Sequence, residues 1–175
     1  MRCPQVVTES YEPSEDFKRA LSRRASGVAV VTTKCGDRIH GMTVSAFTEV
    51  SLDPPLVLVC ADKGANTLPV IREGGVFAIN VLARGQQALS SRFAAKKDEH
   101  KRFDGLAFDV GRTGAPLLRG VAVNIDCRVV AEHDAGDHVV YIGQVEEVRS
   151  FDHEPLLYFR GAYGRFEPHD PLITR

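Results

Sequence analysis

A chain of 175 residues in which 43% are hydrophobic is long enough to fold as one domain with a substantial core. Its 22 Lys and Arg against 23 Asp and Glu leave a net charge of −1, which argues against a general electrostatic attraction to nucleic acid or to an anionic membrane. No stretch reaches the roughly 18 apolar residues of a membrane-spanning helix, and the N-terminus lacks the apolar segment of a signal peptide. We therefore expect a soluble protein with small or polar neutral partners.

The four cysteines indicate a reducing compartment. They are widely spaced and form no CxxC pair, and most fall in strand-like sequence: Cys3, Cys35, Cys60 and Cys127. Small disulfide-stapled domains instead carry closely spaced cysteines. We therefore expect reduced thiols and a cytoplasmic location.

The first part of the chain predicts an arm, a short helix and a β-hairpin. Residues 1–13 contain two prolines and little periodicity, so we expect a loose arm that packs on a partner subunit. Residues 14–24 have acidic residues at the start and apolar residues at i, i+3 and i+4, which is typical of an amphipathic helix. A β-branched run at 28–33, a turn at 35–37 and an extended pattern from Ile39 onward predict the hairpin.

The middle of the chain alternates strands with two helical segments. The sequence PPLVLVCAD at 54–62 is too short and too rich in β-branched residues for a buried helix, so it predicts a strand. Residues 67–73 predict one or two helical turns ended by two glycines, and VFAINVLA at 76–83 predicts the next strand. Residues 86–102, rich in Ala, Gln, Lys and Arg, predict the second helical region.

The last part of the chain predicts a long connection followed by strands. Clustered glycines and a proline between 105 and 120 indicate an excursion without regular structure. Apolar and polar residues then alternate from 121 to 129, the period-two pattern of a strand with one buried face. HDAGDH at 133–138 supplies a turn, and the sequences at 138–148 and 155–167 predict the final strands.

These elements predict a mainly β fold with helices. Seven or so strands without regular βαβ alternation favour an antiparallel barrel decorated by helices, and a β-sandwich fits the same strand count. The strand LVLVCAD is too apolar for an exposed edge, so barrel closure or a dimer must cover it. The expected division is an arm at 1–13, one domain at 14–168 and a C-terminal tail at 169–175.

Several common catalytic motifs are absent from the sequence. No GxGxxG follows a strand, and GxxxxGK[ST], HExxH and GxSxG are missing, which argues against the usual dinucleotide, triphosphate, zinc protease and serine hydrolase sites. His133, His138 and His153 could converge with Asp137 on a metal ion, but their spacing is not that of a ligand set. We therefore predict no metal site.

The segment GMTVSAFT at 41–48 carries hydroxyl groups and few large side chains ahead of an apolar strand. On spacing alone, the favoured interpretation is that Thr43, Ser45 and Thr48 simply alternate outward along an ordinary strand. The other interpretation is that small residues let a flat heterocycle approach the backbone. In the next segment, DKGANT, the residues suited to holding a phosphate are Lys63, Asn66 and Thr67.

Five motifs together resemble the flavin reductase family, whose fold is the FMN-binding split barrel. In chain order they are ASGVAVVTT, GMTVSAFTEVSLDPPLVLVCADKGANT, FAINVLARGQQALSSRFA, the AGDH turn and PLLYFRGAYG, and they span about residues 17–166. The resemblance implies a homodimer of six-stranded split barrels that binds FMN or FAD near the subunit interface. It also implies hydride transfer from NADH or NADPH to the flavin, with reduced flavin often passing to a partner monooxygenase.

The resemblance also assigns site residues. The first flavin segment, which would meet the isoalloxazine edge, comprises Thr43, Val44, Ser45, Ala46, Phe47 and Thr48. The second flavin segment, nearer the ribityl chain and phosphate, comprises Cys60, Ala61, Asp62, Lys63, Asn66 and Thr67. The remaining assignments are Phe93 and Ala94 near the flavin tail, Asp137 and His138 at the nicotinamide, and Tyr163 closing the flavin site.

Hydride transfer needs two rings held at reacting distance more than it needs a protein acid or base, so no catalytic side chain is predicted, with His138 the one candidate. Cys60 is expected to be a small buried residue rather than a nucleophile. Arg92, Lys96 and Lys97 could meet phosphates, although charged residues on such a helix usually form a solvated face.

Some questions stay open at the level of sequence. Ala25 stands where many relatives have proline, so the approach to the first strand can differ from theirs. The choices between FMN and FAD, between NADH and NADPH, and between flavin as substrate and flavin as prosthetic group are not decided. The alternative function is a non-catalytic flavin- or haem-binding module with a sensing or storage role on the same barrel.

Overall fold

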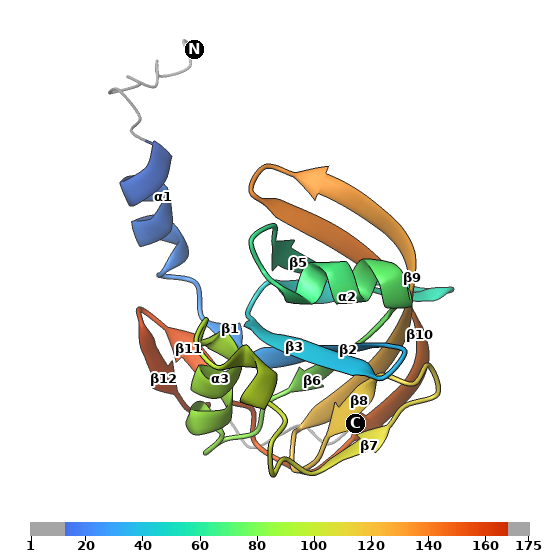
Figure 1. Cartoon of the computed structure of the whole chain (residues 1–175). Coiled ribbons are helices and arrows are strands. Elements are labelled where there is room, and N and C mark those ends of the chain that lie inside the picture. The colour runs from blue at the N-terminus through green and yellow to red at the C-terminus, as the bar shows by residue number, and fades with distance from the viewer. Residues whose placement is uncertain (1–12, 168–175) are drawn as a thin grey trace.

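The computed structural model describes residues 13–167, and its main element is a seven-stranded sheet curled into a barrel (Figure 1). In spatial order the strands are β3 (Arg38–Val44), β2 (Ala29–Cys35), β6 (Val76–Val81), β9 (Val123–Ala135), β10 (His138–Ser150), β5 (Pro55–Asp62) and β4 (Phe47–Leu52). All neighbouring strands in this sheet are antiparallel. The predicted mainly β, antiparallel fold is therefore confirmed, and the sheet has the seven strands that the pattern predicts rather than the six that the resemblance implies.

The two edge strands of this sheet are consecutive in the chain, which forces the sheet to close. Only Ser45 and Ala46 join the end of β3 to the start of β4. Seven strands laid flat would place the edges about 29 Å apart, whereas the three peptide steps from Val44 to Phe47 reach at most about 11 Å. The sheet must therefore curl until its edges meet. The backbone N–H of Cys60 on β5 donates to the carbonyl of Ala46 at 2.9 Å and fixes this join.

Strand β2 is buried on both faces, which explains its continuous β-branched sequence. Ala29 and Val31 belong to the cluster that fills the barrel, together with Phe77 and Tyr141. Val30 belongs to a second apolar cluster outside the barrel wall. The core therefore has two layers separated by the sheet.

Two helices cover the barrel. The helix α2 (Thr67–Gly74) places Leu68 and Ile71 in the barrel cluster, and α3 (Gln87–Ala94) places Phe93 in the outer cluster. Phe93 packs directly on Gly41 of β3, where an added Cβ would lie 2.9 Å from its ring. A glycine at this point lets α3 lie close to the sheet.

The remaining elements are short. The helix α1 (Pro13–Leu21) stands away from the barrel in Figure 1, and the 3₁₀ helix η1 (Glu99–Lys101) follows α3. A small sheet is formed by β1 (Ser26–Gly27), β11 (Leu157–Phe159) and β12 (Ala162–Gly164), and a hairpin by β7 (Phe108–Val110) and β8 (Pro116–Leu118). Among residues 13–167, no helix is long and apolar enough to cross a membrane.

Some local predictions were wrong. The segment 105–120 is not irregular, because it contains the β7–β8 hairpin. The hairpin turn is held by the buried Asp126 of β9, which accepts bonds from the backbone N–H of Thr113 at 2.8 Å and from its hydroxyl. The predicted helix at 86–102 ends at Ala94. The expected arm, apart from Pro13, and the tail at 169–175 lie outside the described residues.

Gly143 of β10 provides a test of the packing between the barrel wall and its core. An added Cβ would lie 2.4 Å from the Phe77 ring and 2.8 Å from Cβ of Cys127. Gly143→Ala should therefore lower the free energy of unfolding by about 1–3 kcal/mol through overpacking, measured by urea denaturation. Gly164→Ala is the matched control, because an added Cβ there meets nothing within 4 Å. Equal stability of the two variants would contradict this account of the core.

Candidate functional site

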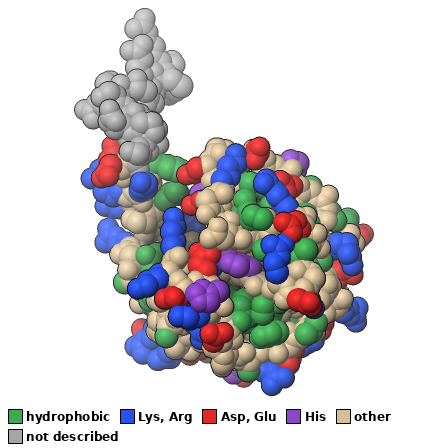
Figure 2. Space-filling view, in the orientation of Figure 1, with side chains coloured by type: hydrophobic (Ala, Val, Ile, Leu, Met, Phe, Trp, Pro, Cys, Tyr) green, Lys and Arg blue, Asp and Glu red, His purple; other side chains and the backbone are tan. Residues whose placement is uncertain are grey.

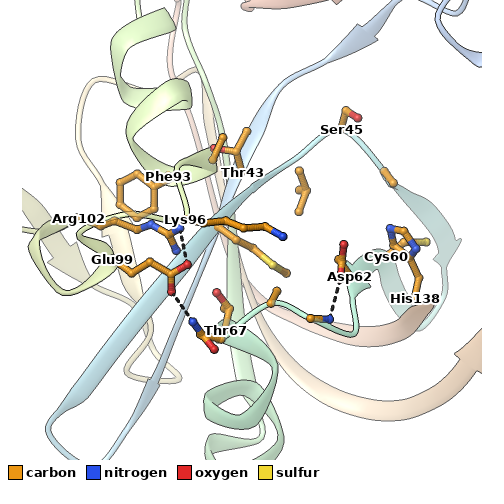
Figure 3. Close-up of a pocket in the computed structure, with 17 residues that line it drawn as sticks. Thr43, Ser45, Cys60, Asp62, Thr67, Phe93, Lys96, Glu99, Arg102 and His138 are labelled. Carbon is orange, nitrogen blue, oxygen red and sulfur yellow. Dashed lines mark hydrogen bonds and ion pairs between the residues drawn. The ribbon is translucent and has the colours of Figure 1, made fainter. Parts of the chain in front are cut away.

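A cavity of about 390 Å³ opens where the chain passes from β3 to β4 (Figure 3). Its volume falls in the range of small-molecule sites, near the lower end. Most of the predicted site residues line it, namely Thr43, Val44, Ser45, Ala46, Cys60, Asp62, Asn66, Thr67, Phe93, Ala94 and His138. The predicted residues outside this lining are Phe47, Thr48, Ala61, Lys63, Asp137 and Tyr163.

The join between the edge strands forms one wall of the cavity. Ser45 and Ala46 are exposed and lie between the strands, so their backbone is not part of a regular ladder. The hydroxyl of Thr43 donates to the carbonyl of Ser90 at 2.6 Å and so holds α3. Thr48 lies on exposed β4, where its hydroxyl donates to Glu49. The hydroxyls of Thr43 and Thr48 thus have partners within the chain. Of the three, only the hydroxyl of Ser45 lines the cavity without a partner among the described residues.

The floor of the cavity is the turn that leads from β5 into α2. The carboxylate of Asp62 accepts a bond from the backbone N–H of Gly64 at 2.6 Å and shapes this turn. The helix α2 then begins at Thr67, so its positive N-terminal end faces the cavity. Lys63 points elsewhere, because its ammonium pairs with Asp134 at 3.1 Å. Lys63, which the sequence suggests as a phosphate ligand, therefore forms an ion pair with the β9–β10 hairpin instead.

Lys96 supplies a positive charge at the cavity. From the sequence, this residue is expected on the solvent-exposed face of a helix. The helix α3 ends at Ala94, and Ala95 is extended with φ −67° and ψ 131°. The chain therefore turns over the cavity, and Figure 3 shows the Lys96 side chain pointing toward its centre. Among residues 13–167, Lys96 forms no ion pair.

Arg102 anchors the segment that carries Lys96. Its side chain is 5% exposed, and Nη1 donates to the carbonyl of Gly41 on β3 at 2.7 Å. Nη2 donates to the carbonyl of Ala95 at the end of α3 and lies 3.1 Å from Oε1 of Glu99. Burial lowers the pKa of this guanidinium, but Glu99 opposes the shift. One buried side chain thus fixes both ends of the turn to the barrel.

Glu99 joins this anchor to the floor of the cavity. Its Oε2 accepts a bond from Asn66 at 3.0 Å and lies 3.3 Å from Nε2 of His40. Burial acts to raise the pKa of Glu99, but the bond from Asn66 and the charges of Arg102 and His40 outweigh it and hold the pKa below its usual value. The pKa of His40 is lowered chiefly by burial and then by Arg102. Near pH 7, therefore, Glu99 is ionised and His40 is neutral, and His40 contributes its charge to Glu99 only at lower pH.

His138 lies at the other end of the cavity. It begins β10 and pairs in register with Asp62 of β5, and Figure 3 shows it beside Cys60, across the cavity from Glu99 and Arg102. Its Nδ1 lies 2.7 Å from the carboxylate of the exposed Asp137, which leaves Nε2 available. The carbonyl of Asp137 accepts a bond from the backbone N–H of Lys63 at 2.9 Å. The imidazole is thus oriented by Asp137, whose own backbone is held by the bond from Lys63.

The other predicted residues support the cavity from outside its lining. Tyr163 donates from its hydroxyl to Oγ of Ser90 at 2.9 Å, so it contacts α3 rather than the cavity. Ala61 is buried in the barrel core, and Phe47 packs against the same cluster. Cys60, by contrast, lines the cavity and is only half-buried, not buried as expected, whereas the fully buried Cys127 has its pKa raised to about 12 by burial.

Sequence reasoning did not single out Glu99 and Arg102, because nothing local marks them. Their roles depend on contacts with β3 and α2, more than 30 residues away along the chain. The histidines considered for a metal site are not gathered either, and residues 13–167 contain no group of three His, Cys, Asp or Glu that could hold an ion.

Comparisons with known proteins agree with this geometry. The family described as "Flavin reductase like domain" matches residues 21–167. An NADH-dependent flavin reductase from Rhodococcus sp is 45% identical over 161 residues, which cover 87% of this chain and 89% of the relative. The reductase component of 4-hydroxyphenylacetate 3-monooxygenase from Thermus thermophilus is 40% identical over 152 residues, covering 86% and 95%.

A solved structure is also similar. The NADH:FAD oxidoreductase of Streptomyces globisporus, in complex with NAD and FAD fragments, superimposes with a TM-score of 0.85 at 31% identity and covers 92% of this chain and 97% of that one. The family match, the sequence relatives and this shared barrel lead to one conclusion. The chain belongs to the flavin reductase family.

Proposed function

We propose that this chain is an NAD(P)H:flavin oxidoreductase that acts in the cavity at the β3–β4 join. One observation carries the proposal: the same cavity offers small side chains at Ser45 and Ala46, a Lys96 with no ion pair among residues 13–167 and, at the other end, His138. A flat ring can approach exposed backbone at the join, and a phosphate can lie between Lys96 and the N-terminus of α2. The nicotinamide would then enter beside His138.

The reaction requires little proton chemistry from the protein. Flavin supplies the capacity to accept a hydride from the reduced nicotinamide, so the residues need only bind and orient the two rings. The join at Ser45 and Ala46 would offer backbone groups to the flavin edge, and Asp137, which orients the imidazole of His138, would present it to the nicotinamide. Thr43 and Tyr163 act through Ser90, because both hold α3 in place.

We assign the reductant and the partner by similarity. The Rhodococcus relative is NADH-dependent, which supports NADH as the hydride donor here. The Thermus relative is the reductase component of a monooxygenase, which supports delivery of reduced flavin to a separate oxygenase. The cysteines among the described residues are free thiols, which is consistent with the proposed cytoplasmic location.

We also propose a homodimer, supported by apolar side chains that one copy leaves uncovered. Phe17 and Leu21 on α1 are 52% and 50% exposed, and Leu52 on edge strand β4 is 92% exposed. A second copy packed against the projecting helix α1 and the edge strand β4 would cover these side chains. Light scattering on the purified protein should give twice the mass of one chain, and the mass of a single chain at micromolar concentration would contradict the proposal.

Steady-state oxidation of the nicotinamide tests the function. With FMN or FAD and NADH or NADPH compared in parallel, absorbance at 340 nm should fall over many turnovers per protein. Ala46→Trp places a bulky ring in the cavity and should raise the flavin Kd by about tenfold or more. Thr48→Trp is the control, because Thr48 is exposed and outside the cavity lining. Flavin binding without oxidation in any pairing would instead favour the non-catalytic binding module.

His138→Ala tests the place of the nicotinamide. Because the imidazole lies at the end of the cavity opposite Lys96, its loss should raise the KM for NADH by about tenfold and change the KM for flavin far less. Asp137→Asn keeps the imidazole but weakens its orientation, so a smaller change in the same direction is expected. An unchanged KM for NADH would remove His138 from the site.

A further inference from the structure

Glu99 places a negative charge where the proposed function puts a phosphate. It lines the cavity together with Lys96 and with Asn66, the residue that precedes α2. Its side chain is 17% exposed, and the carboxylate is ionised near pH 7. In Figure 2, acidic, basic and histidine side chains lie close together on the face over β3 and α3. Because like charges repel, a carboxylate at this position opposes phosphate binding unless it does something else there.

The carboxylate of Glu99 meets side chains from three parts of the chain. Its Oε1 lies 3.1 Å from Nη2 of Arg102, which follows η1. Its Oε2 accepts a bond from the amide of Asn66 at 3.0 Å and lies 3.3 Å from Nε2 of His40 on β3. One carboxylate therefore connects β3, the start of α2 and the segment after α3.

Asn66 shows the effect of this connection at the start of α2. An Asn at this position usually caps the first turn of the helix with its side chain. Here the side chain makes no cap bond, and its amide donates to Glu99 instead. The backbone N–H of Asn66 has no backbone acceptor among residues 13–167. With the Asn66 side chain held aside, the positive end of the helix stays open to an anion.

The same carboxylate acts on Lys96 through Arg102. Nη2 of Arg102 donates to the carbonyl of Ala95, the residue before Lys96, and the same nitrogen pairs with Glu99. Glu99 thus orients the nitrogen that fixes the backbone next to Lys96. A charge on a fixed backbone loses less conformational freedom when it binds a ligand than a charge on a mobile one.

We propose that Glu99 is a positioning residue for the flavin phosphate, and that it strengthens phosphate binding by holding Asn66 and Lys96 in place. The inference rests on the proposed function, which puts a phosphate between Lys96 and α2. Glutamine has nearly the shape of Glu, but it offers one acceptor oxygen and one amide nitrogen that only donates. Since Arg102 and Asn66 donate to different oxygens of Glu99, one of them would face a donor in Glu99→Gln and lose its bond.

Binding of FMN and of riboflavin, followed by flavin fluorescence without nicotinamide, tests this. Riboflavin has the same ring but no phosphate, so the unmodified protein should bind FMN more tightly. Glu99→Gln should raise the Kd for FMN by about tenfold and leave the Kd for riboflavin unchanged. Glu154→Gln is the matched control and should change neither Kd. Glu154 also pairs with an arginine, Arg84 at 2.7 Å, but neither residue lines the cavity.

The sign of the change separates positioning from repulsion. A lower or unchanged Kd for FMN in Glu99→Gln would overturn the inference, because it would leave the carboxylate with no favourable effect on the phosphate. A rise in both Kd values would also overturn it, by assigning Glu99 to the stability of the whole cavity. So would equal Kd values for FMN and riboflavin in the unmodified protein. The expected binding results without any oxidation of NADH or NADPH would instead refute the proposed reductase activity alone.

Discussion

Only Ser45 and Ala46 are available for the chain to pass from one edge of the seven-stranded sheet to the other. Because so short a link cannot span a flat sheet, the barrel closes, and its split lies at these two residues. Backbone that would otherwise pair in a ladder is left at the surface of a cavity there. Closure of the fold and creation of a binding wall therefore have the same cause.

The opposite wall depends on electrostatics rather than on strand pairing. The buried Arg102 pairs with the partly buried Glu99, and burying a charge costs free energy unless further hydrogen bonds satisfy it. Here the two terminal nitrogens of the guanidinium donate to the carbonyls of Gly41 on β3 and of Ala95 just after α3, although Nε has no partner among residues 13–167, and the carboxylate also accepts from Asn66. The pair thus attaches an otherwise irregular segment firmly enough to carry Lys96 over the cavity.

The sequence was informative where a residue's role depends on its neighbours along the chain. The β-branched run of β2, the alternation along β9 and the small residues of the join could all be interpreted locally. The resemblance to flavin reductases located most of the cavity lining. The β7–β8 hairpin was missed because its stability comes from Asp126, on a different strand.

Charged residues show the same limit most clearly. Lys63 directly follows the apolar strand, a position that predicts a phosphate ligand, but its ammonium pairs with Asp134 of the β9–β10 hairpin. Lys96 looked like part of a solvated helix, yet the helix ends two residues before it. Periodicity can predict which face of a helix is exposed to solvent. It cannot predict where the helix ends, or which acidic residue far away in the sequence forms an ion pair with a lysine.

The anchoring of the segment after α3 has a consequence for how such a protein can change over evolutionary time. Arg102 holds this segment largely through backbone carbonyls, those of Gly41 and Ala95, which any sequence provides. Apart from Glu99, which pairs with Arg102 and accepts a bond from Asn66, the residues between Ala95 and Arg102 can therefore be replaced without disturbing the attachment or the barrel beneath it. Divergence in the ligands accepted can accumulate in this one exposed turn, while the join at Ser45 and Ala46, which has no length to spare, stays the same.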